Sequence, residues 1–335
     1  MKKIAFVASD SSSISGITGG LEIFKVANLL NRIQNPGKPN RFECSVIAFA
    51  KGSFTISPGL VCEFSKGLSM EERYDAIILI GFIYKDISQL IKKIDSSKEA
   101  VSWILKQYLA GALIGANCSA TLLLAETGLL DRKSATTSWW LNALFKKRYP
   151  KIKLEIDSLI VENERLICSG ALTSYLNLAL CIIEKFTDKS LALSCSKMML
   201  IDINKNSQAP YIMQQRLLDL SDDMVTKAQH WIYSNFQNKI DFQMLSNHLA
   251  VSYRTFIRRF KIAAGETPSR YLQKLRIEAS KDLLETTNLN LETIMESVGY
   301  SDTSSFSLLF KRLTHLTPKE YRNRFSMDQL IKREN

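Results

Sequence analysis

Two arginines lie four residues apart in a stretch that carries basic side chains and no acidic ones. Arg254 and Arg258 fall within residues 242–265, which contain no Asp or Glu. Residues four apart share one face of a helix. An arginine on a helix in the major groove can donate two hydrogen bonds to a guanine, worth about 1–3 kcal/mol of discrimination. By itself this spacing is more typical of a solvated helix surface. Within the duplicated pattern described next, we predict a DNA-reading helix with Arg254 and Arg258 as its base contacts.

This helix belongs to a pattern that the chain contains twice, fifty residues apart. Each copy has two phenylalanines four apart, a lysine, a Thr-Pro pair and a tyrosine: Phe256, Phe260, Lys261, Thr267, Pro268 and Tyr271 match Phe306, Phe310, Lys311, Thr317, Pro318 and Tyr321. Helical spacing predicts paired helices at 241–249 and 253–263, and again at 291–298 and 303–314, with a long helix over 269–286 between the pairs. We expect two helix-turn-helix units, with each phenylalanine pair facing the core.

The two copies differ where they would touch bases. Ser304 and Leu308 stand where the first copy has Arg254 and Arg258, so the second helix lacks the bidentate guanine contact. Leu308 could instead meet a thymine methyl group. Around these positions we expect further, mostly phosphate, contacts, and the complete predicted DNA-binding set is Tyr253, Arg254, Arg258, Arg259, Lys261, Thr303, Ser304, Ser307, Lys311 and Arg312. We therefore predict a lopsided operator, with sharper sequence demands under the first recognition helix.

A cysteine in the first half of the chain has the local pattern of a nucleophile elbow. Residues 115–119, Gly-Ala-Asn-Cys-Ser, run from a predicted strand directly into a predicted helix. A small-residue turn there would hold Cys118 at the carboxyl edge of a sheet, beside a helix N-terminus. A thiol needs a base, a cation or an acid nearby to react at neutral pH, yet no histidine precedes His230. A buried structural cysteine is an equal interpretation of the spacing.

The elements around Cys118 alternate between strands and helices. Short apolar runs at 4–8, 42–49, 76–80 and 112–116 read as strands, and segments at 21–32, 101–110, 119–126 and 172–186 read as helices. This alternation predicts a parallel sheet covered by helices on both faces. The carboxyl edge of such a sheet is where small ligands bind.

Longer strings in the chain resemble a known family. Residues 123–131 and 135–140, with shorter strings at 21–28, 169–171 and 208–211, resemble the DJ-1/PfpI-like (class I glutamine amidotransferase-like) domain as it occurs in the GlxA-type branch of the AraC-family regulators. Residues 299–312 and 317–322 resemble the AraC-family signature. The resemblance extends from Lys3 to Phe325. It implies a flavodoxin-like N-terminal domain and an all-α C-terminal domain with two helix-turn-helix units bridged by one helix.

The resemblance also bears on whether Cys118 is catalytic. The histidine that enzymes of this superfamily usually carry is replaced by Ser138, and the expected position of their acidic partner falls on Gly16. Glu22, the nearest alternative, is expected on the solvent face of its helix. We therefore predict no catalytic residues and a non-catalytic ligand pocket near Cys118, Ser119, Ser138 and Trp139, with Trp140 as a second candidate. The alternatives are a thiol enzyme or redox sensor using Cys118, ligand-independent regulation, and tryptophans that merely pack in the core.

The totals restrict the class of protein. A chain of 335 residues that is 46% hydrophobic and 23% charged fits a soluble protein of two or three domains, and its net charge of +11 fits a nucleic-acid partner. The six cysteines form no C-x-x-C pair, which favours free thiols in a reducing cytoplasm over disulfides or zinc. The N-terminal apolar run stops at Ser9, too short for a signal peptide, and no run could span a membrane.

These observations predict a sensor or dimerisation domain at 1–201, a linker at 202–221 with a possible short helix at 211–220, a DNA-binding domain at 222–326 and a tail at 327–335. The predicted function is cytoplasmic, sequence-specific transcription regulation, with activation more usual than repression in the family. The expected partners are promoter DNA, a small-molecule effector, a second copy of the chain and, for an activator, RNA polymerase. No cofactor, metal or membrane is expected.

Overall fold

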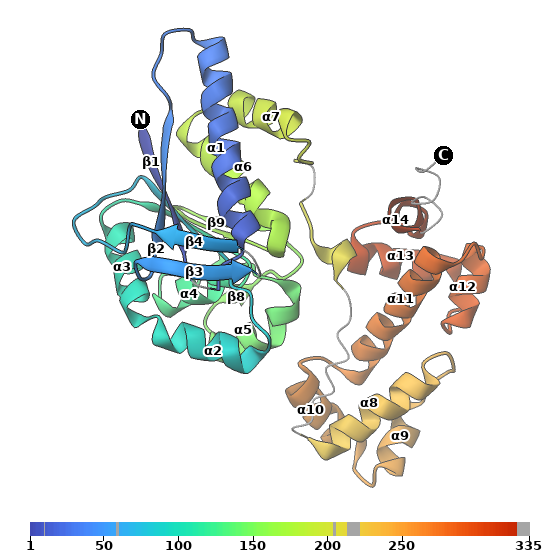
Figure 1. Ribbon diagram of the computed structural model, residues 1–335. Helices are drawn as coiled ribbons and strands as arrows, with labels where there is room; N and C mark the ends of the chain where they lie inside the picture. Colours follow the sequence, from blue (N-terminus) through green and yellow to red (C-terminus); the bar gives the residue numbers. More distant parts are fainter. Residues whose placement is uncertain (10, 58–59, 204–205, 213–221, 327–335) are drawn as a thin grey trace. The chain divides into compact units, whose positions relative to one another are not determined.

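A computed structural model describes the chain except for residues 10, 58–59, 204–205, 213–221 and 327–335. The fold divides into two compact units, Met1–Gln208 and Ala209–Asn335 (Figure 1). Most of the helix expected at 211–220 and the whole expected tail lie outside the described residues. The 3-10 helix η3 (Ala209–Tyr211) stands at the start of the second unit.

The first unit is built on a six-stranded sheet. Its strands have the order β2-β1-β5-β6-β10-β9. Their bounds are β1 (Lys2–Ala8), β2 (Phe42–Ala48), β5 (Ala76–Leu79), β6 (Leu113–Asn117), β9 (Ile160–Asn163) and β10 (Leu166–Ser169). The first five in this order run parallel, as predicted, but β9 pairs with β10 in the antiparallel sense. The predicted parallel sheet is confirmed for these five strands, and β9 adds an antiparallel edge strand that the sequence did not predict.

Helices cover both faces of the sheet (Figure 1). One apolar cluster packs α1 (Ile14–Gln34), α6 (Tyr175–Phe186) and α7 (Lys189–Met198) against the sheet, and a second packs α2 (Ile87–Ser96), α3 (Lys98–Leu109), α4 (Ala120–Glu126) and α5 (Asn142–Arg148). Small additions are the hairpin β3 (Gly52–Ser57) and β4 (Leu60–Phe64), the pair β7 (Ser134–Ala135) and β8 (Lys153–Leu154), and the 3-10 helices η1 (Trp139–Leu141) and η2 (Leu172–Ser174).

The second unit is helical and has two separate cores. Its helices are α8 (Asp223–Asn235), α9 (Phe242–His248), α10 (Tyr253–Ala264), α11 (Pro268–Thr286), α12 (Leu291–Ser297), α13 (Thr303–Thr314) and α14 (Pro318–Phe325). One core gathers around Phe256 and Phe260, and the other around Phe306 and Phe310. Helix α11 contributes side chains to both. The predicted pair of helix-turn-helix units bridged by one long helix is confirmed.

Candidate functional site

The first recognition helix, α10, presents its arginines as the spacing predicted. The Ser252 hydroxyl caps the helix by accepting a hydrogen bond from the Thr255 N–H at 3.3 Å. Phe256 is fully buried, whereas Arg254 and Arg258 are exposed. Neither arginine forms an ion pair with any described residue. The two guanidinium groups are therefore available to an external partner, together with the exposed Tyr253 and Lys261.

Arg259, which we predicted as a DNA contact, is paired with an acidic residue of the same unit. Its Nε and Nη2 donate to the two carboxylate oxygens of Asp222 at 2.9 and 2.6 Å. Asp222 is also the N-cap of α8, where it accepts from the backbone N–H groups of Met224 and Val225. The Arg259 guanidinium holds the pKa of this carboxyl below its ordinary value. Arg259 thus ties α10 to α8, and a phosphate contact would have to use its remaining nitrogen or break the pair.

The second recognition helix, α13, is built in the same way but presents a different surface. Asp302 caps it by accepting from the Ser305 N–H at 2.7 Å. Leu308 stands 72% exposed where α10 has an arginine. The predicted phosphate contacts Thr303, Ser304, Lys311 and Arg312 are exposed, and Ser307 is half-buried. The two recognition helices therefore expose different side chains at matching positions.

The turns before the recognition helices are not identical. Four residues separate α9 from α10, and five separate α12 from α13. The first turn places Ala250 at a positive φ of 54°, and the second places Gly299 at 85°. A Cβ on Gly299 would lie 2.6 Å from the Gln237 carbonyl oxygen. The second turn therefore requires glycine, whereas the first tolerates a small side chain.

Arg276, on α11, helps to hold the two helix-turn-helix units together. Its Nε donates to the Phe236 carbonyl at 2.7 Å, and its Nη2 donates to the Asn238 carbonyl at 2.8 Å. The same guanidinium lies over the ring of Tyr300, in the second turn. One side chain thus connects the loop between α8 and α9 to the turn before α13.

The predicted elbow at Cys118 is present in the first unit. Cys118 follows β6 and precedes α4, with a positive φ of 58°. Its carbonyl accepts from the Thr137 hydroxyl at 2.7 Å, and its N–H donates to the Ser169 carbonyl at 3.0 Å. Two neighbouring segments, those of Thr137 and Ser169, therefore fix the turn. The sharp strand-to-helix geometry expected from the small residues around Cys118 is confirmed.

The environment of the Cys118 thiol favours its neutral form. Cys118, Ser119 and Ser138 are all buried, and the Cys118 Sγ lies 2.7 Å from the Ser138 Oγ. Burial raises the pKa of the thiol, although hydrogen bonds from Ser138 and Ser119 oppose this. Glu22 is exposed on α1, as expected, and Gly16 occupies the place where an acid was sought. The elbow has the geometry of a nucleophile site and hydroxyl groups in place of a base.

The other predicted pocket residues form the edge of this site. Trp139 and Trp140 are both half-buried and meet edge to face, with ring centroids 5.1 Å apart. The Trp140 Nε1 donates to the Tyr84 hydroxyl at 2.7 Å, and Trp140 packs on the adjoining core. The Ser119 hydroxyl is bonded to the backbone of Phe82. Trp139 and Trp140 therefore retain accessible surface, while the serines are enclosed.

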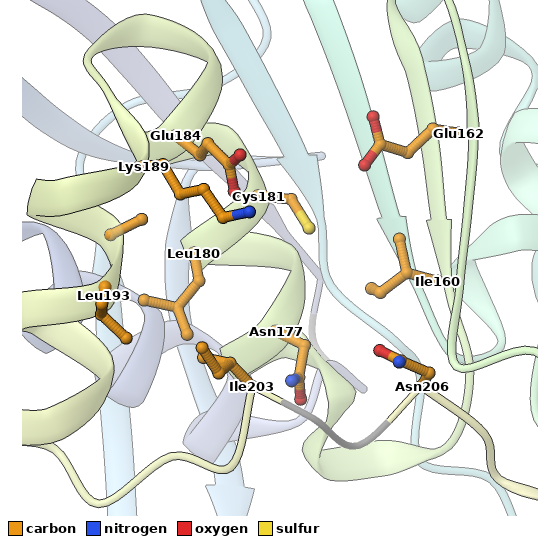
Figure 2. Close-up of a pocket in the computed structure, with 11 residues that line it drawn as sticks. Ile160, Glu162, Asn177, Leu180, Cys181, Glu184, Lys189, Leu193, Ile203 and Asn206 are labelled. Carbon is orange, nitrogen blue, oxygen red and sulfur yellow. The ribbon is translucent and has the colours of Figure 1, made fainter.

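A cavity of about 570 Å³ in the first unit is lined by other residues than those predicted for the ligand pocket (Figure 2). Strand β9 and helices α6 and α7 line it with Ile160, Glu162, Asn177, Leu180, Cys181, Glu184, Lys189, Ala192 and Leu193, and the chain beyond α7 adds Ile203 and Asn206. Glu162 pairs with Lys185 at 2.6 Å. A wall with both charge signs and apolar surface suits a small polar organic molecule. This cavity was not predictable from the sequence, because its lining residues come from separate segments of the chain.

The described residues include neither a candidate metal site nor a disulfide nor a membrane-spanning helix. Among the described residues, no group of three or more His, Cys, Asp or Glu side chains could hold a metal ion. All six cysteines are free. In the part of the chain that the structure describes, no helix combines the length and apolar character needed to cross a membrane.

Comparison with known proteins covers both units. Residues 2–185 match the DJ-1/PfpI family, and residues 245–324 match a helix-turn-helix domain. The HTH-type transcriptional regulator GbdR of Pseudomonas aeruginosa is 21% identical over 322 residues, which cover 96% of this chain and 84% of that protein. The HTH-type transcriptional regulator ArgR of the same organism is 27% identical over 242 residues, covering 70% and 73%.

A solved structure shares the fold of the first unit. A transcriptional regulator protein from Vibrio parahaemolyticus matches with a TM-score of 0.52 and 20% identity, over 59% of this chain and 98% of that chain. The family match alone spans more than half of the present chain. The chain therefore belongs to the DJ-1/PfpI family and combines that domain with an AraC-type helix-turn-helix domain.

Proposed function

We propose that this protein is a sequence-specific DNA-binding transcription regulator whose first unit modulates the second. The observation that carries the proposal is the exposed pair Arg254 and Arg258 on a capped helix whose opposite face is anchored by Phe256 and Phe260. A second helix-turn-helix unit stands beside it on α11. The regulator names of the full-length relatives support the same reading.

The first unit acts in this proposal as a sensor for a small-molecule effector. We place the effector at the elbow, near Cys118, Ser119, Ser138 and Trp139, because ligands of doubly wound sheets bind at the carboxyl edge. Binding there requires the enclosed serines to become accessible, so an effector would select a more open state. A catalytic role is disfavoured by the buried, neutral thiol and by hydroxyl partners that cannot act as its base at neutral pH.

The remaining parts of the proposal concern the cell. We propose a cytoplasmic regulator that binds promoter DNA as a homodimer. Activation, through contact with RNA polymerase, is the sign of regulation that we favour. The basic composition of the chain supports the nucleic-acid partner.

The decisive experiment selects bound fragments from the source genome with the purified full-length protein at physiological salt. The Arg254→Ala/Arg258→Ala double variant is the comparison, and Lys319→Ala, an exposed basic residue on α14, is the control for loss of charge alone. We expect the wild type and the control to enrich a few promoters through a shared motif, and the double variant to lose that motif. Equal, sequence-independent binding by all three proteins would refute the proposal.

A further inference from the structure

The last residue of the first unit, Gln208, is held inside that unit by several hydrogen bonds. Its side chain is 1% exposed. The Oε1 atom accepts from the Ala171 N–H at 3.0 Å, and the Nε2 atom donates to the carbonyls of Ile156 and Thr137 at 2.6 and 2.8 Å. The backbone N–H donates to the Asp157 carbonyl at 2.9 Å. Gln208 is therefore an anchored residue, although the sequence placed it in a polar linker.

The loops that hold Gln208 are the loops that form the elbow. Thr137 accepts from Gln208 through its carbonyl and donates its hydroxyl to the Cys118 carbonyl at 2.7 Å. Ala171 lies two residues after Ser169, whose carbonyl accepts from the Cys118 N–H. Any opening of the elbow that moves Thr137 or Ala171 must therefore disturb the hydrogen bonds of Gln208.

Three residues further along, the chain is held by the second unit. The Tyr211 hydroxyl accepts from the Arg324 Nη2 at 2.7 Å, and its ring meets the Phe325 ring edge to face at 5.3 Å. The carbonyl of Ile212 accepts a hydrogen bond from Lys281, whose side chain is buried on α11. Helices α11 and α14, which carry this anchor, also pack in the core of the second helix-turn-helix unit.

Only two residues separate the two anchors, and both lie in a closed turn. Ala209 and Pro210 are buried and lie in the short helix η3. The Ile212 N–H closes this turn by donating to the Ala209 carbonyl at 3.2 Å, and the proline ring fixes its own φ. A flexible linker would dissipate a displacement at one end. A closed turn of two residues transmits it to the other end.

We propose that residues 208–211 are the coupling link through which the state of the elbow sets the DNA affinity of the second unit. The inference rests on the proposed function and adds the route of regulation. When the elbow changes state, Gln208 loses or regains its bonds to Thr137 and Ala171, and the Tyr211 anchor shifts against α14. Coupling of this kind is reciprocal, so DNA binding must alter the elbow by the same factor, typically about 5- to 150-fold.

Reciprocity allows the link to be tested without knowing the effector. Amide hydrogen exchange of the full-length protein is measured with and without the promoter fragment that the genomic selection recovers. We expect DNA to change protection in the elbow segments around Cys118, Thr137 and Ala171 by about 5- to 150-fold. Protection of these buried segments should not change with a scrambled fragment of equal length.

Two variants interrupt the link in different ways. Gln208→Met removes the side-chain hydrogen bonds of the first anchor while keeping a side chain of similar length. Insertion of Gly-Ser-Gly-Ser between Ala209 and Pro210 keeps both anchors and slackens the chain between them. Gln34→Met, the same substitution at an exposed glutamine on α1, is the matched control. We expect both link variants to bind the promoter fragment but lose its effect on the elbow, and the control to retain it.

The outcomes separate this inference from the function on which it rests. If the wild type binds the fragment specifically but the elbow does not respond, or if the insertion variant responds as the wild type does, the coupling link is refuted and the regulator function stands. If the wild type fails to bind any fragment specifically, the proposed function fails first. Thermal unfolding shows whether the first unit of Gln208→Met is folded. If that variant is unfolded, the insertion variant alone tests whether residues 208–211 couple the elbow to DNA binding.

Discussion

Arg258 and Arg259 are neighbours with opposite environments. Arg258 is exposed and forms no ion pair with a described residue, whereas Arg259 is paired with Asp222 at the start of α8. We expect Arg258→Ala to weaken specific DNA binding by about 5- to 150-fold, corresponding to roughly 1–3 kcal/mol for a bidentate guanine contact, with little change in stability. Arg259→Ala should lower the melting temperature while affecting specificity less. Fluorescence anisotropy and thermal unfolding of the two variants test this, and the reverse pattern would contradict it.

The same ion pair predicts a dependence of stability on pH. The pKa of Asp222 is lowered in the folded state, chiefly by its hydrogen bonds to Arg259. Its stabilising contribution is therefore fully present above the ordinary pKa of about 3.9 and is lost as the pH falls through the lowered value. The difference in stability between the wild type and Arg259→Ala should shrink over that acidic range. A difference that persists unchanged under those conditions would assign the effect to packing.

At the residue scale, the sequence predicted local helix faces but not contacts between distant residues. Helical spacing separated Phe256 and Phe260 from Arg254 and Arg258, because the period of a helix is a local property. It could not reveal that Arg259 meets Asp222, 37 positions earlier, because that contact depends on how α8 packs against α10. Burial of the Cys118 thiol is likewise a property of the whole sheet edge.

At the scale of elements, the sequence predicted segments with a clear apolar run or helical period and missed or shortened others. The bounds of α13 agree with the prediction, and those of α10 and α11 differ from it by one residue at one end. Strand β9 has only four residues and gives no recognisable period. Helix α1 begins at Ile14, before the predicted start, because its early glycines resemble a loop. One of them, Gly20, instead allows close packing on the ring of Phe6.

The turn before α13 provides a prediction about stability. Gly299 has a φ of 85° and no room for a Cβ beside the Gln237 carbonyl, whereas Gly265, with a φ of 75°, has no atom within 4 Å of that position. Both Gly→Ala changes incur a left-handed backbone cost of about 1–2 kcal/mol. Gly299→Ala should cost roughly 1–3 kcal/mol more because of overpacking. Chemical denaturation of the two variants measures the difference, and equal losses would show that the turn can relax.

The two recognition helices predict an operator with unequal halves. Helix α10 exposes two arginines, and α13 exposes Leu308 and Ser304 at the matching positions. Guanine contacts discriminate strongly, whereas phosphate contacts carry no sequence information. Saturation mutagenesis of an operator should therefore find more information under α10. Leu308→Arg should raise the demand for guanine under α13, and equal information in both halves of the wild-type site would contradict the prediction.

At the scale of the whole molecule, the separate cores divide the tasks between the units. The sheet of the first unit presents the elbow at its edge, and the second unit carries both recognition helices on the frame of α11. The sequence predicted this division because each unit has its own period of apolar residues. The residues 208–211 belong to neither pattern, and only the three-dimensional contacts show that both ends of this segment are fixed.

The rigid frame predicts the spacing of DNA contacts. Helix α11 spans 19 residues without interruption, and Arg276 fastens it to both helix-turn-helix units. The recognition helices should therefore enter successive major grooves about 34 Å, or roughly 10 base pairs, apart on one face of the duplex. A homodimer would double this footprint. Inserting five base pairs between the two boxes of a half-site turns the second box to the opposite face.

We expect this insertion to reduce affinity, because a fixed frame can then engage only one box. Changing five base pairs between the boxes without altering their distance is the control, and it should leave binding intact. Gel-shift titrations of the three DNAs provide the measurement. Full affinity on the lengthened site would mean that α11 lets the two helix-turn-helix units move independently. The DNA would then select their separation on binding.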